Sequence, residues 1–550
     1  MDSYKLHFIP LGGIVGVTKN MYVYELYRGE ELQDILLIDC GIGFPPEQEF
    51  GIDHAIPDIG YLKDKVDKIR AMLFTHGHED HIGAIRFHYN DLGKPPMYAS
   101  KLTSVFLQNK FKEFNMSPKI TQVDYDRYYT FGGFKVKYIR MTHSIPDTTH
   151  ILISCPAGTF YHGSDYKIDL TPPFGPAPDF FEITKAGKEG VTCLLSDSLG
   201  SDREGFTLSE SSVGKTFEEE IRTAKGKFFM TTFASNISRI RQCAEAAVKF
   251  NRKICLLGRS MKQNTRAARQ IGYFPIPESF LIDEKEVKKY RPNHVCIICT
   301  GSQGQIGSAL SRLAAEDNKQ IRIDKGDKVV FSSDPIPGNE EVVYEMIEHL
   351  YVLGADVRYS DVQEQLHASG HGSQGDLKML MRLVGAEYLV PIGGTIRHQR
   401  HYRELAREMD YKDDQIFLLN EGDTIWFENG KVKKGEQVQT KNIYVDAYGV
   451  GDVGETILRD RMTLSKEGFV FAVLKLDGNG KLVDRPEFTA RGFIFGNLDE
   501  IFEGAAELLE EVYKKAQNPP LKRDITARLE RYFYSKTNKE PLVCLHTLRV

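Results

Sequence analysis

The sequence has few of the features that mark secreted, membrane-spanning or disordered proteins. Only eight of its 550 residues are cysteine, and the single tryptophan is Trp426. No uninterrupted apolar run approaches the length of a bilayer-spanning helix, and residues 1–5 do not have the charged start of a signal segment. Neither an internal repeat nor a low-complexity tract is present. These absences favour a cytoplasmic protein with no membrane partner.

The cysteines do not have the spacing of a disulfide framework. Five of them fall in or beside apolar, strand-like runs and are expected to be buried, reduced thiols: Cys155, Cys193, Cys255, Cys296 and Cys299. Cys296 and Cys299 have the spacing of a metal or redox pair, but no second pair completes a zinc site. A buried strand is therefore the preferred interpretation of that segment.

Charge of either sign is not in large excess. The formal net charge is −5, which argues neither for nor against RNA, because an acidic protein can still present a locally basic groove to phosphates. A hydrophobic share of 41% is enough for real cores, and the length predicts about three or four domains.

A histidine-rich segment is the strongest chemical signal in the chain. It reads Thr75-His76-Gly77-His78-Glu79-Asp80-His81, between an apolar run that predicts a buried strand and a run that predicts a helix start. The ligand atoms would stand at the carboxyl end of a strand, where open α/β sheets place their sites. Imidazole and carboxylate donors together suit zinc or manganese. We expect His76 and His78 to bind one ion, and Asp80 and His81 to bind a second.

Three further residues of ligand type also follow predicted strands. His143 comes after the run 134–142, and Asp165 comes after the run 159–164. A carboxylate such as Asp165 can bridge two ions through its two oxygens. Asp39 closes the apolar run 35–38 and is expected to orient a ligating histidine. Taken singly, each is more often an ordinary polar residue, but in this order they reinforce one another.

The pattern of predicted helices and strands changes near residue 210. Up to about residue 209, short apolar runs separated by Gly and Pro turns predict a strand-rich layer with a few helices. From about 210 to 359, helices and strands alternate, which predicts a second, parallel α/β domain. The expected helices are 217–223, 237–250 and 264–271, and the expected strands are 227–232, 253–257, 294–299 and 328–332. Near the C-terminus, a strand at 469–476 and helices at 498–516 and 525–535 are expected.

Short motifs along nearly the whole chain resemble the ribonuclease J family, the β-CASP branch of the metallo-β-lactamase superfamily. Besides the histidine block, the matching segments are 19–25, 231–239, 258–261, 300–304, 335–340, 367–373 and 449–454. The resemblance implies an αββα metallo-β-lactamase sandwich in residues 1–209 and 360–447. It also implies an inserted β-CASP domain in 210–359 and a linker with a small α/β C-terminal domain in 448–550.

The resemblance also assigns residues outside the metal ligands. In the segment 367–373, it implies that His367 acts at the scissile phosphate and that Ser369, Gly370, His371 and Ser373 hold a 5′-monophosphate. Ser235 and Asn236, at a strand-to-helix junction with Arg239 nearby, are expected to contact the substrate phosphates, although such residues usually only cap a helix. Asp197 joins Asp39 as a residue expected to support ligating side chains.

One position departs from the family pattern. After Pro391, the pattern places a metal-binding histidine where this chain has Gly393. We therefore expect a tight first ion at His76, His78, His143 and Asp165, and a weak second ion at Asp80, His81 and Asp165. His398 and His401 are the candidate substitutes for the missing ligand, though neither is aligned with it. Zinc is the expected metal, with manganese or magnesium as alternatives.

The leading hypothesis is a two-metal ribonuclease of RNA processing and decay, with Asp80 and His367 in catalysis. It would combine 5′-to-3′ exonuclease activity, which prefers a 5′-monophosphate, with endonuclease activity on single-stranded RNA, as a homodimer or homotetramer formed through the C-terminal domain. The alternative is a weakly active or inactive RNA-binding paralogue that assembles with an active ribonuclease. A small-molecule hydrolase is a third possibility, which the long inserted domain disfavours.

Overall fold

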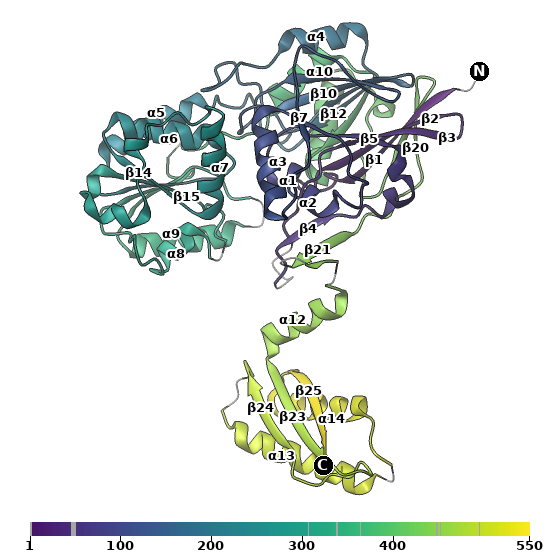
Figure 1. The fold of residues 1–550 in the computed structure, drawn as a ribbon, viewed down its shortest axis with the longest axis vertical. Coiled ribbons are helices and arrows are strands. Elements are labelled where there is room, and N and C mark those ends of the chain that lie inside the picture. The colour runs from purple at the N-terminus through teal and green to yellow at the C-terminus, as the bar shows by residue number, and fades with distance from the viewer. Residues whose placement is uncertain are drawn as a thin grey trace. The chain divides into compact units, whose positions relative to one another are not determined.

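The chain forms two compact units in the computed structural model (Figure 1). One comprises Met1–Gly43 and Ile56–Asn442, and the other comprises Phe44–Ala55 and Ile443–Val550. The structure describes residues 3–45, 51–305, 307–336, 339–363, 365–446, 449–451, 453–493, 496–516 and 518–550. The expected domain boundary at 447/448, residues 337 and 338 of the 335–340 motif, and residue 452 of the 449–454 motif lie outside these ranges.

The first unit is built on a sandwich of two sheets, called the sandwich domain below. Its first sheet has the strand order β20-β19-β1-β2-β3-β5-β6-β7. The strands are β1 (Tyr4–Gly12), β2 (Met21–Arg28), β3 (Glu31–Ile38), β5 (Ile69–Leu73), β6 (Met97–Ala99), β7 (Ile120–Gln122), β19 (Ile425–Glu428) and β20 (Lys431–Lys434). The half from β3 to β7 is parallel, whereas the other half is antiparallel.

The second sheet has the order β18-β12-β11-β10-β9-β8. Its strands are β8 (Tyr129–Phe131), β9 (Phe134–Arg140), β10 (Thr149–Cys155), β11 (Gly158–Gly163), β12 (Cys193–Asp197) and β18 (Tyr388–Ile392). Strands β11, β12 and β18 are parallel, and β8 to β11 pair antiparallel. As a result, β9, β11, β12 and β18 all end at the same edge of the sheet.

Helices cover the two outer faces of the sandwich. They are α1 (Glu79–Ile82), α2 (Ile85–His88), α3 (Lys101–Glu113), α4 (Phe180–Glu189), α10 (Gln374–Val384) and α11 (Ile396–Glu408), with 3-10 turns at Gly60–Lys68 and Asp413–Gln415. Side chains from both sheets, such as Phe8, Leu36, Ile151 and Phe160, form the core between them. A second core packs α4, α10 and α11 on the outside of the second sheet. The expected αββα arrangement is therefore confirmed.

The inserted domain, residues 211–358, is a five-stranded parallel sheet of order β14-β15-β13-β16-β17. Its elements are α5 (Ser211–Thr223), β13 (Phe228–Thr231), α6 (Ile237–Lys249), β14 (Lys253–Leu257), α7 (Arg259–Gln270), β15 (Val295–Cys299), α8 (Ala309–Ala314), β16 (Lys328–Phe331), α9 (Glu340–Val352) and β17 (Asp356–Arg358), with 3-10 turns at Glu278–Phe280, Glu284–Lys289 and Pro292–His294. Figure 1 shows α5 and α6 on one side of the sheet and α8 and α9 on the other. The predicted parallel domain is confirmed, and Cys296 and Cys299 are buried in β15, as expected.

The second unit is a small α/β domain. Its main sheet has the order β24-β23-β25, and two helices pack on one face. The elements are α12 (Glu455–Glu467), β23 (Phe469–Leu476), β24 (Glu487–Arg491), α13 (Leu498–Lys515), α14 (Lys522–Thr537) and β25 (Leu542–Arg549). A further sheet joins β22 (Gly449–Val450), β21 (Asn442–Asp446) and β4 (His54–Pro57). The expected strand and both expected C-terminal helices are present.

Candidate metal centre

Three imidazoles converge where β5 and β9 end. The loop after β5 carries His76 and His78, and the segment after β9 carries His143. Nδ1 of His78 lies 3.1 Å from Nε2 of His76 and 3.1 Å from Nε2 of His143. Asp165, which follows β11, completes a group of four potential ligand atoms within 4.8 Å of one another. The four residues expected to hold the first ion are thus brought together.

The other ring nitrogens of these histidines are held by hydrogen bonds. Nδ1 of His143 donates to the carbonyl oxygen of Gly370 at 2.7 Å, which leaves its Nε2 as a bare acceptor. Nδ1 of His76 lies 3.1 Å from the hydroxyl of Thr75, which itself donates to Asp39. Burial and neighbouring imidazoles lower the pKa of His76 and His143 well below 6.5, and burial lowers that of His78 to about 3.

Neutral imidazoles with facing lone pairs repel one another unless a cation lies between them. The bare Nε2 atoms of His76 and His143 both face Nδ1 of His78, which carries at most one hydrogen, so the three nitrogens cannot all satisfy one another by hydrogen bonds. Nitrogen donors joined by one carboxylate are the donor set that zinc takes in catalytic sites. The residues present therefore fit a divalent cation held by His76, His78, His143 and Asp165.

A second group consists of Asp80, His81 and Asp165. Asp80 and His81 lie in the single turn of α1, and Nε2 of His81 is 3.2 Å from Oδ2 of Asp165. Nδ1 of His81 is 2.8 Å from Asp39, so the buried Asp39 carboxylate fixes the ring with Nε2 toward the site. Asp39 thus lies where the sequence places an orienting residue.

The electrostatics of the second group fit a cation site. Burial alone would lower the pKa of His81, but Asp165, Asp80 and Asp39 raise it well above 6.5. Burial would raise the pKa of Asp165, yet His81, His371 and His76 hold it well below 3.8. Burial and the charge of Asp165 raise the pKa of Asp80 to about 6, against the effect of His81. A cation here would take over the role of the proton on His81.

The structure adds a third group that sequence reasoning missed, formed by Asp165, Asp197 and His371. Asp197 ends β12, and its Oδ2 lies 2.7 Å from Nδ1 of His371. Burial would lower the pKa of His371, but Asp197 and Asp165 raise it to about 9. The signal was present in the sequence, because Asp197 also closes an apolar strand. What joins it to His371 is tertiary structure.

Gly393 follows β18 and faces these carboxylates. A Cβ at this position would lie 3.4 Å from Oδ1 of Asp197 and 3.7 Å from Oδ1 of Asp165. The residue has φ +67, in the left-handed region that favours glycine. The two expected substitutes do not fill this place. His398 faces Asp202 and is bonded to Thr395, and His401 is exposed, so neither belongs to a ligand group among the described residues.

The expected role of His367 at the scissile phosphate stays a prediction, and the structure shows which residues hold this side chain. Its Nδ1 lies 2.6 Å from Nη1 of Arg239, and it belongs to none of the three ligand groups found among the described residues. Burial and the charges of Arg239 and Lys167 lower its pKa well below 6.5. The second histidine of the motif, His371, belongs to the third ligand group.

The loop 369–373 lies directly against the first metal ligands. A side chain at Gly370 would come within 2.6 Å of Cε1 of His143, so only glycine allows this close approach. Ser369 accepts a hydrogen bond from Arg203 at 3.0 Å, while the backbone N–H of Ser373 donates to Thr207 at 2.8 Å. Arg203 is exposed and forms no ion pair with a carboxylate of the described residues. Sequence reasoning did not single it out.

The residues expected at the start of α6 divide into two kinds. Ser235 is half-buried, whereas Asn236 is buried, and its side chain accepts from the backbone N–H of Arg239 at 3.1 Å as a helix cap. Arg239, three residues after Asn236, has no exposed surface at this junction. Its guanidinium is fully buried and binds Glu210 through Nε and Nη2.

The fold and the convergent ligand groups define a metallo-hydrolase of the metallo-β-lactamase superfamily, whose family model matches residues 16–179. The model of the Zn-dependent metallo-hydrolase RNA specificity domain matches residues 354–417. Two models specific to ribonuclease J match two further segments, the β-CASP domain at residues 225–350 and the C-terminal domain at residues 456–550. The chain belongs to the ribonuclease J family.

Named relatives are similar in sequence to this chain over almost its whole length. The chain is 36% identical to ribonuclease J2 of Bacillus subtilis over 552 residues, covering 98% of both chains. It is also 36% identical to ribonuclease J of Thermus thermophilus over 550 residues, covering 98% of this chain and 94% of that one. A crystal structure of a protein of unknown function from Enterococcus faecalis shares the fold, with a TM-score of 0.56, 15% identity, and 77% of this chain and 100% of that chain covered. Among the described residues, no helix is long and apolar enough to cross a membrane.

Proposed function

We propose that this chain is a metal-dependent ribonuclease that removes nucleotides from the 5′ end of single-stranded RNA and also cuts internally. The observation that carries the proposal is the set of three neutral imidazoles whose ring nitrogens converge beside Asp165, in a chain that matches named ribonucleases J over nearly its whole length. The proposed role is RNA processing and decay. Preference for a 5′-monophosphate belongs to the same proposal.

The residues proposed to hold divalent cations are the first two ligand groups. His76, His78, His143 and Asp165 would hold one ion, and Asp80, His81 and Asp165 would hold the other, with zinc favoured over manganese or magnesium by the nitrogen donors. A bound divalent cation at such a site lowers the pKa of water and neutralises charge on phosphoryl oxygens. Asp80, which belongs to the second ligand group, is proposed to steer the proton of the attacking water.

His367 is proposed to donate a hydrogen bond or proton to the departing oxygen. Ser369, Gly370, His371 and Ser373 are proposed to hold the 5′-monophosphate beside it, with Arg203 as a further cation of the pocket. Asp197 lies 2.7 Å from Nδ1 of His371 and favours the protonated imidazole, which suits a phosphate ligand. Seating the terminal phosphate next to the proton donor would favour removal of one nucleotide at a time.

The second ion is proposed to be weakly held. Gly393 supplies no ligand atom beside Asp165 and Asp197, so this side of the site lacks the imidazole of the family pattern. Loss of one ligand leaves more of the coordination shell to water, which lowers affinity. Purified protein is expected to retain the first ion and to release the second on dialysis.

A homodimer or homotetramer formed through the C-terminal domain is the proposed assembly. The helices α13 and α14 cover only one face of the sheet β24-β23-β25, and their core includes Val470 and Leu529. The other face presents partly exposed apolar side chains, among them Phe469, Phe471 and Leu548. A second copy would cover this face.

A weakly active RNA-binding paralogue, which needs an active partner, is the second candidate. Gly393 is the observation that favours it, since the substitution removes a ligand of the second ion. The six residues of the first two ligand groups argue against it, because a non-catalytic protein has no chemical need to keep them. Activity of the isolated chain with added manganese or zinc separates the two candidates.

The direct test is digestion of one RNA carrying a 5′-monophosphate, triphosphate or hydroxyl end, with and without a chelator. Mononucleotide products that depend on the monophosphate and disappear with the chelator are expected. Asp80→Ala should abolish cleavage and leave RNA binding intact, whereas Glu79→Gln, in the same turn but outside the ligand groups, should stay active. Cleavage by Asp80→Ala would remove the proposed mechanism.

A further inference from the structure

Arg239 is fully buried, and all five of its N–H donors have partners. Nε and Nη2 donate to the two oxygens of Glu210 at 2.8 and 2.7 Å. Nη2 also donates to the carbonyl oxygen of Ala368 at 2.9 Å. Nη1 donates to the carbonyl oxygen of Ser332 at 2.8 Å and to Nδ1 of His367 at 2.6 Å. One side chain therefore joins the end of β16, the start of α5 and the 367–373 motif.

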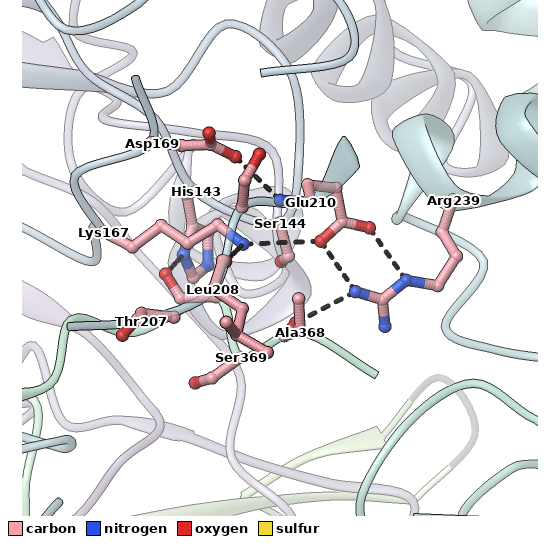
Figure 2. A network of polar contacts seen from close by, with 12 residues as sticks. His143, Ser144, Lys167, Asp169, Thr207, Leu208, Glu210, Arg239, Ala368 and Ser369 are labelled. Carbon is pink, nitrogen blue, oxygen red and sulfur yellow. Dashed lines mark hydrogen bonds and ion pairs between the residues drawn. The ribbon is translucent and has the colours of Figure 1, made fainter. Parts of the chain in front are cut away.

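Glu210 connects this cluster to the sandwich domain. Its carboxylate lies 3.5 Å from the amino group of Lys167, which also donates to the carbonyl oxygen of Leu208 at 3.1 Å. The backbone N–H of Glu210 donates to Asp169 at 2.8 Å. Figure 2 shows the Glu210 carboxylate between the amino group of Lys167 and the guanidinium of Arg239, with Ala368 beside the latter. Both Lys167 and Glu210 are buried.

The loop that Arg239 holds continues directly into the candidate site. Two residues after Ala368, the carbonyl oxygen of Gly370 accepts the hydrogen bond that fixes the ring of His143. Nδ1 of His371, one residue further, lies 2.7 Å from Oδ2 of Asp197. The path from Arg239 to the first metal group thus runs through a short piece of backbone and one hydrogen bond.

We propose that Arg239 and Glu210 are positioning residues, which set the 367–371 backbone and thereby the orientation of His143 and His371. The proposal rests on the proposed ribonuclease function only for its kinetic part, because the effect on cation binding is independent of the reaction. Neither residue touches the reacting atoms. Because the two residues pair, the ligands of the site are oriented correctly only when the inserted domain packs correctly on the sandwich domain.

The chemistry of the guanidinium explains why arginine is needed here. Its planar fork matches a carboxylate with two parallel hydrogen bonds and still has donors for three further acceptors, whereas a lysine ammonium offers three donors from one point. Loss of the Glu210 charge would leave the Arg239 charge buried without a counterion. The guanidinium would then shift toward other acceptors, and the Ala368 and His367 contacts would change with it.

The test compares Glu210→Gln with Asp327→Asn, which neutralises another buried carboxylate of the inserted domain. Asp327 pairs with Lys227 at 2.8 Å at the amino end of β16, opposite the end where Ser332 contacts Arg239. Both variants remove one buried counterion, so their losses of stability should be comparable. Arg239→Lys serves as a second variant that keeps the charge and removes the fork.

The measurements are zinc affinity by chelator competition, and kcat and KM on a 5′-monophosphate RNA. Loss of a residue that orients a ligand typically costs about 10- to 100-fold in metal affinity or activity. We expect a loss of this size in zinc affinity and in kcat for Glu210→Gln and Arg239→Lys, with KM nearly unchanged, and no such loss for Asp327→Asn.

Zinc affinity tests the positioning role, and RNA cleavage tests the proposed function. Equal zinc affinity in Glu210→Gln, Asp327→Asn and the unmodified chain would overturn the positioning role, whatever the activity. An unmodified chain that binds zinc but cuts no RNA would overturn the proposed function, while a zinc affinity lowered only in Glu210→Gln and Arg239→Lys would still support the positioning role. If Glu210→Gln does not fold and Arg239→Lys folds with unchanged zinc affinity and kcat, the inference fails.

Discussion

At the scale of single residues, four histidines in or beside the site each have one ring nitrogen hydrogen-bonded to a fixed neighbour. The neighbour is Gly370 for His143, Asp39 for His81, Asp197 for His371 and Arg239 for His367. The committed nitrogen decides which nitrogen faces the site, and so which histidines can act as ligands. Local spacing sufficed to predict His76, His78, Asp80 and His81, since they share one loop and turn. Gly370 lies 227 residues from His143, and no local pattern reveals such a pairing.

The role of Arg203 can be tested at this scale. Its exposed guanidinium donates to Ser369, and a 5′-monophosphate carries up to two negative charges that a hydroxyl end lacks. Arg203→Ala should lower kcat/KM on monophosphate RNA by about 10-fold or more, the size of a lost hydrogen bond to a charged group. Cleavage of hydroxyl-ended RNA should change little. Arg203→Lys should recover part of the preference, and equal losses on both substrates would contradict the assignment.

Gly393 provides the second test at residue scale. A histidine here has space beside Asp165 and Asp197, but its left-handed backbone would cost about 1–2 kcal/mol in stability. Gly393→His should therefore lower the melting temperature and raise the amount of the second zinc ion retained after dialysis. Gly393→Ala carries the same strain without a ligand, so it should lower the melting temperature alone. Equal zinc content in the two variants would show that position 393 does not reach the ion.

At the scale of elements, the site exists because several strands end at one edge. The strands β11, β12 and β18 are parallel neighbours, and β9 points the same way. Asp165 follows β11, Asp197 ends β12, Gly393 follows β18 and His143 follows β9. Strand positions were predictable from alternating apolar runs. The order of the strands was not, because β12 and β18 are separated by the whole inserted domain and pair only through tertiary packing.

Two substitutions of Asn236, at the N-terminus of α6, can distinguish a capping role from a contact with the substrate. Asn236→Ala removes the side-chain acceptor for the backbone N–H of Arg239 and should cost about 1 kcal/mol in stability. Asn236→Asp keeps the cap, so its melting temperature should match that of the unmodified chain. If this helix start faces RNA, the added negative charge should raise KM for RNA in Asn236→Asp. An unchanged KM in this variant would restrict Asn236 to capping.

At the scale of the whole molecule, the two units differ in what their sequences reveal. The first unit holds every predicted ligand, and short motifs with fixed chemistry identify it. The described residues of the second unit contain no ligand group, so only the alternating strand β23 and the amphipathic helices of this unit were predictable. Its proposed role in assembly depends on which sheet face the helices leave uncovered. In β23, Val470, Ala472 and Leu474 are buried under the helices, so Phe469, Phe471 and Val473 point to the other face.

Substitutions on the uncovered face of the sheet β24-β23-β25 can test whether the chain assembles through it. Phe471→Glu combined with Leu548→Glu places two carboxylates on the proposed dimer surface, where burying an unpaired charge is unfavourable. We expect the full-length double variant to sediment as a monomer under conditions where the unmodified chain is a dimer or tetramer. Leu521→Glu is the matched control, because Leu521 is exposed in the same unit but precedes α14 on the helix side. A double variant that keeps the assembly state of the unmodified chain would move the interface elsewhere, and a monomeric control would mean that added charge alone dissociates the assembly.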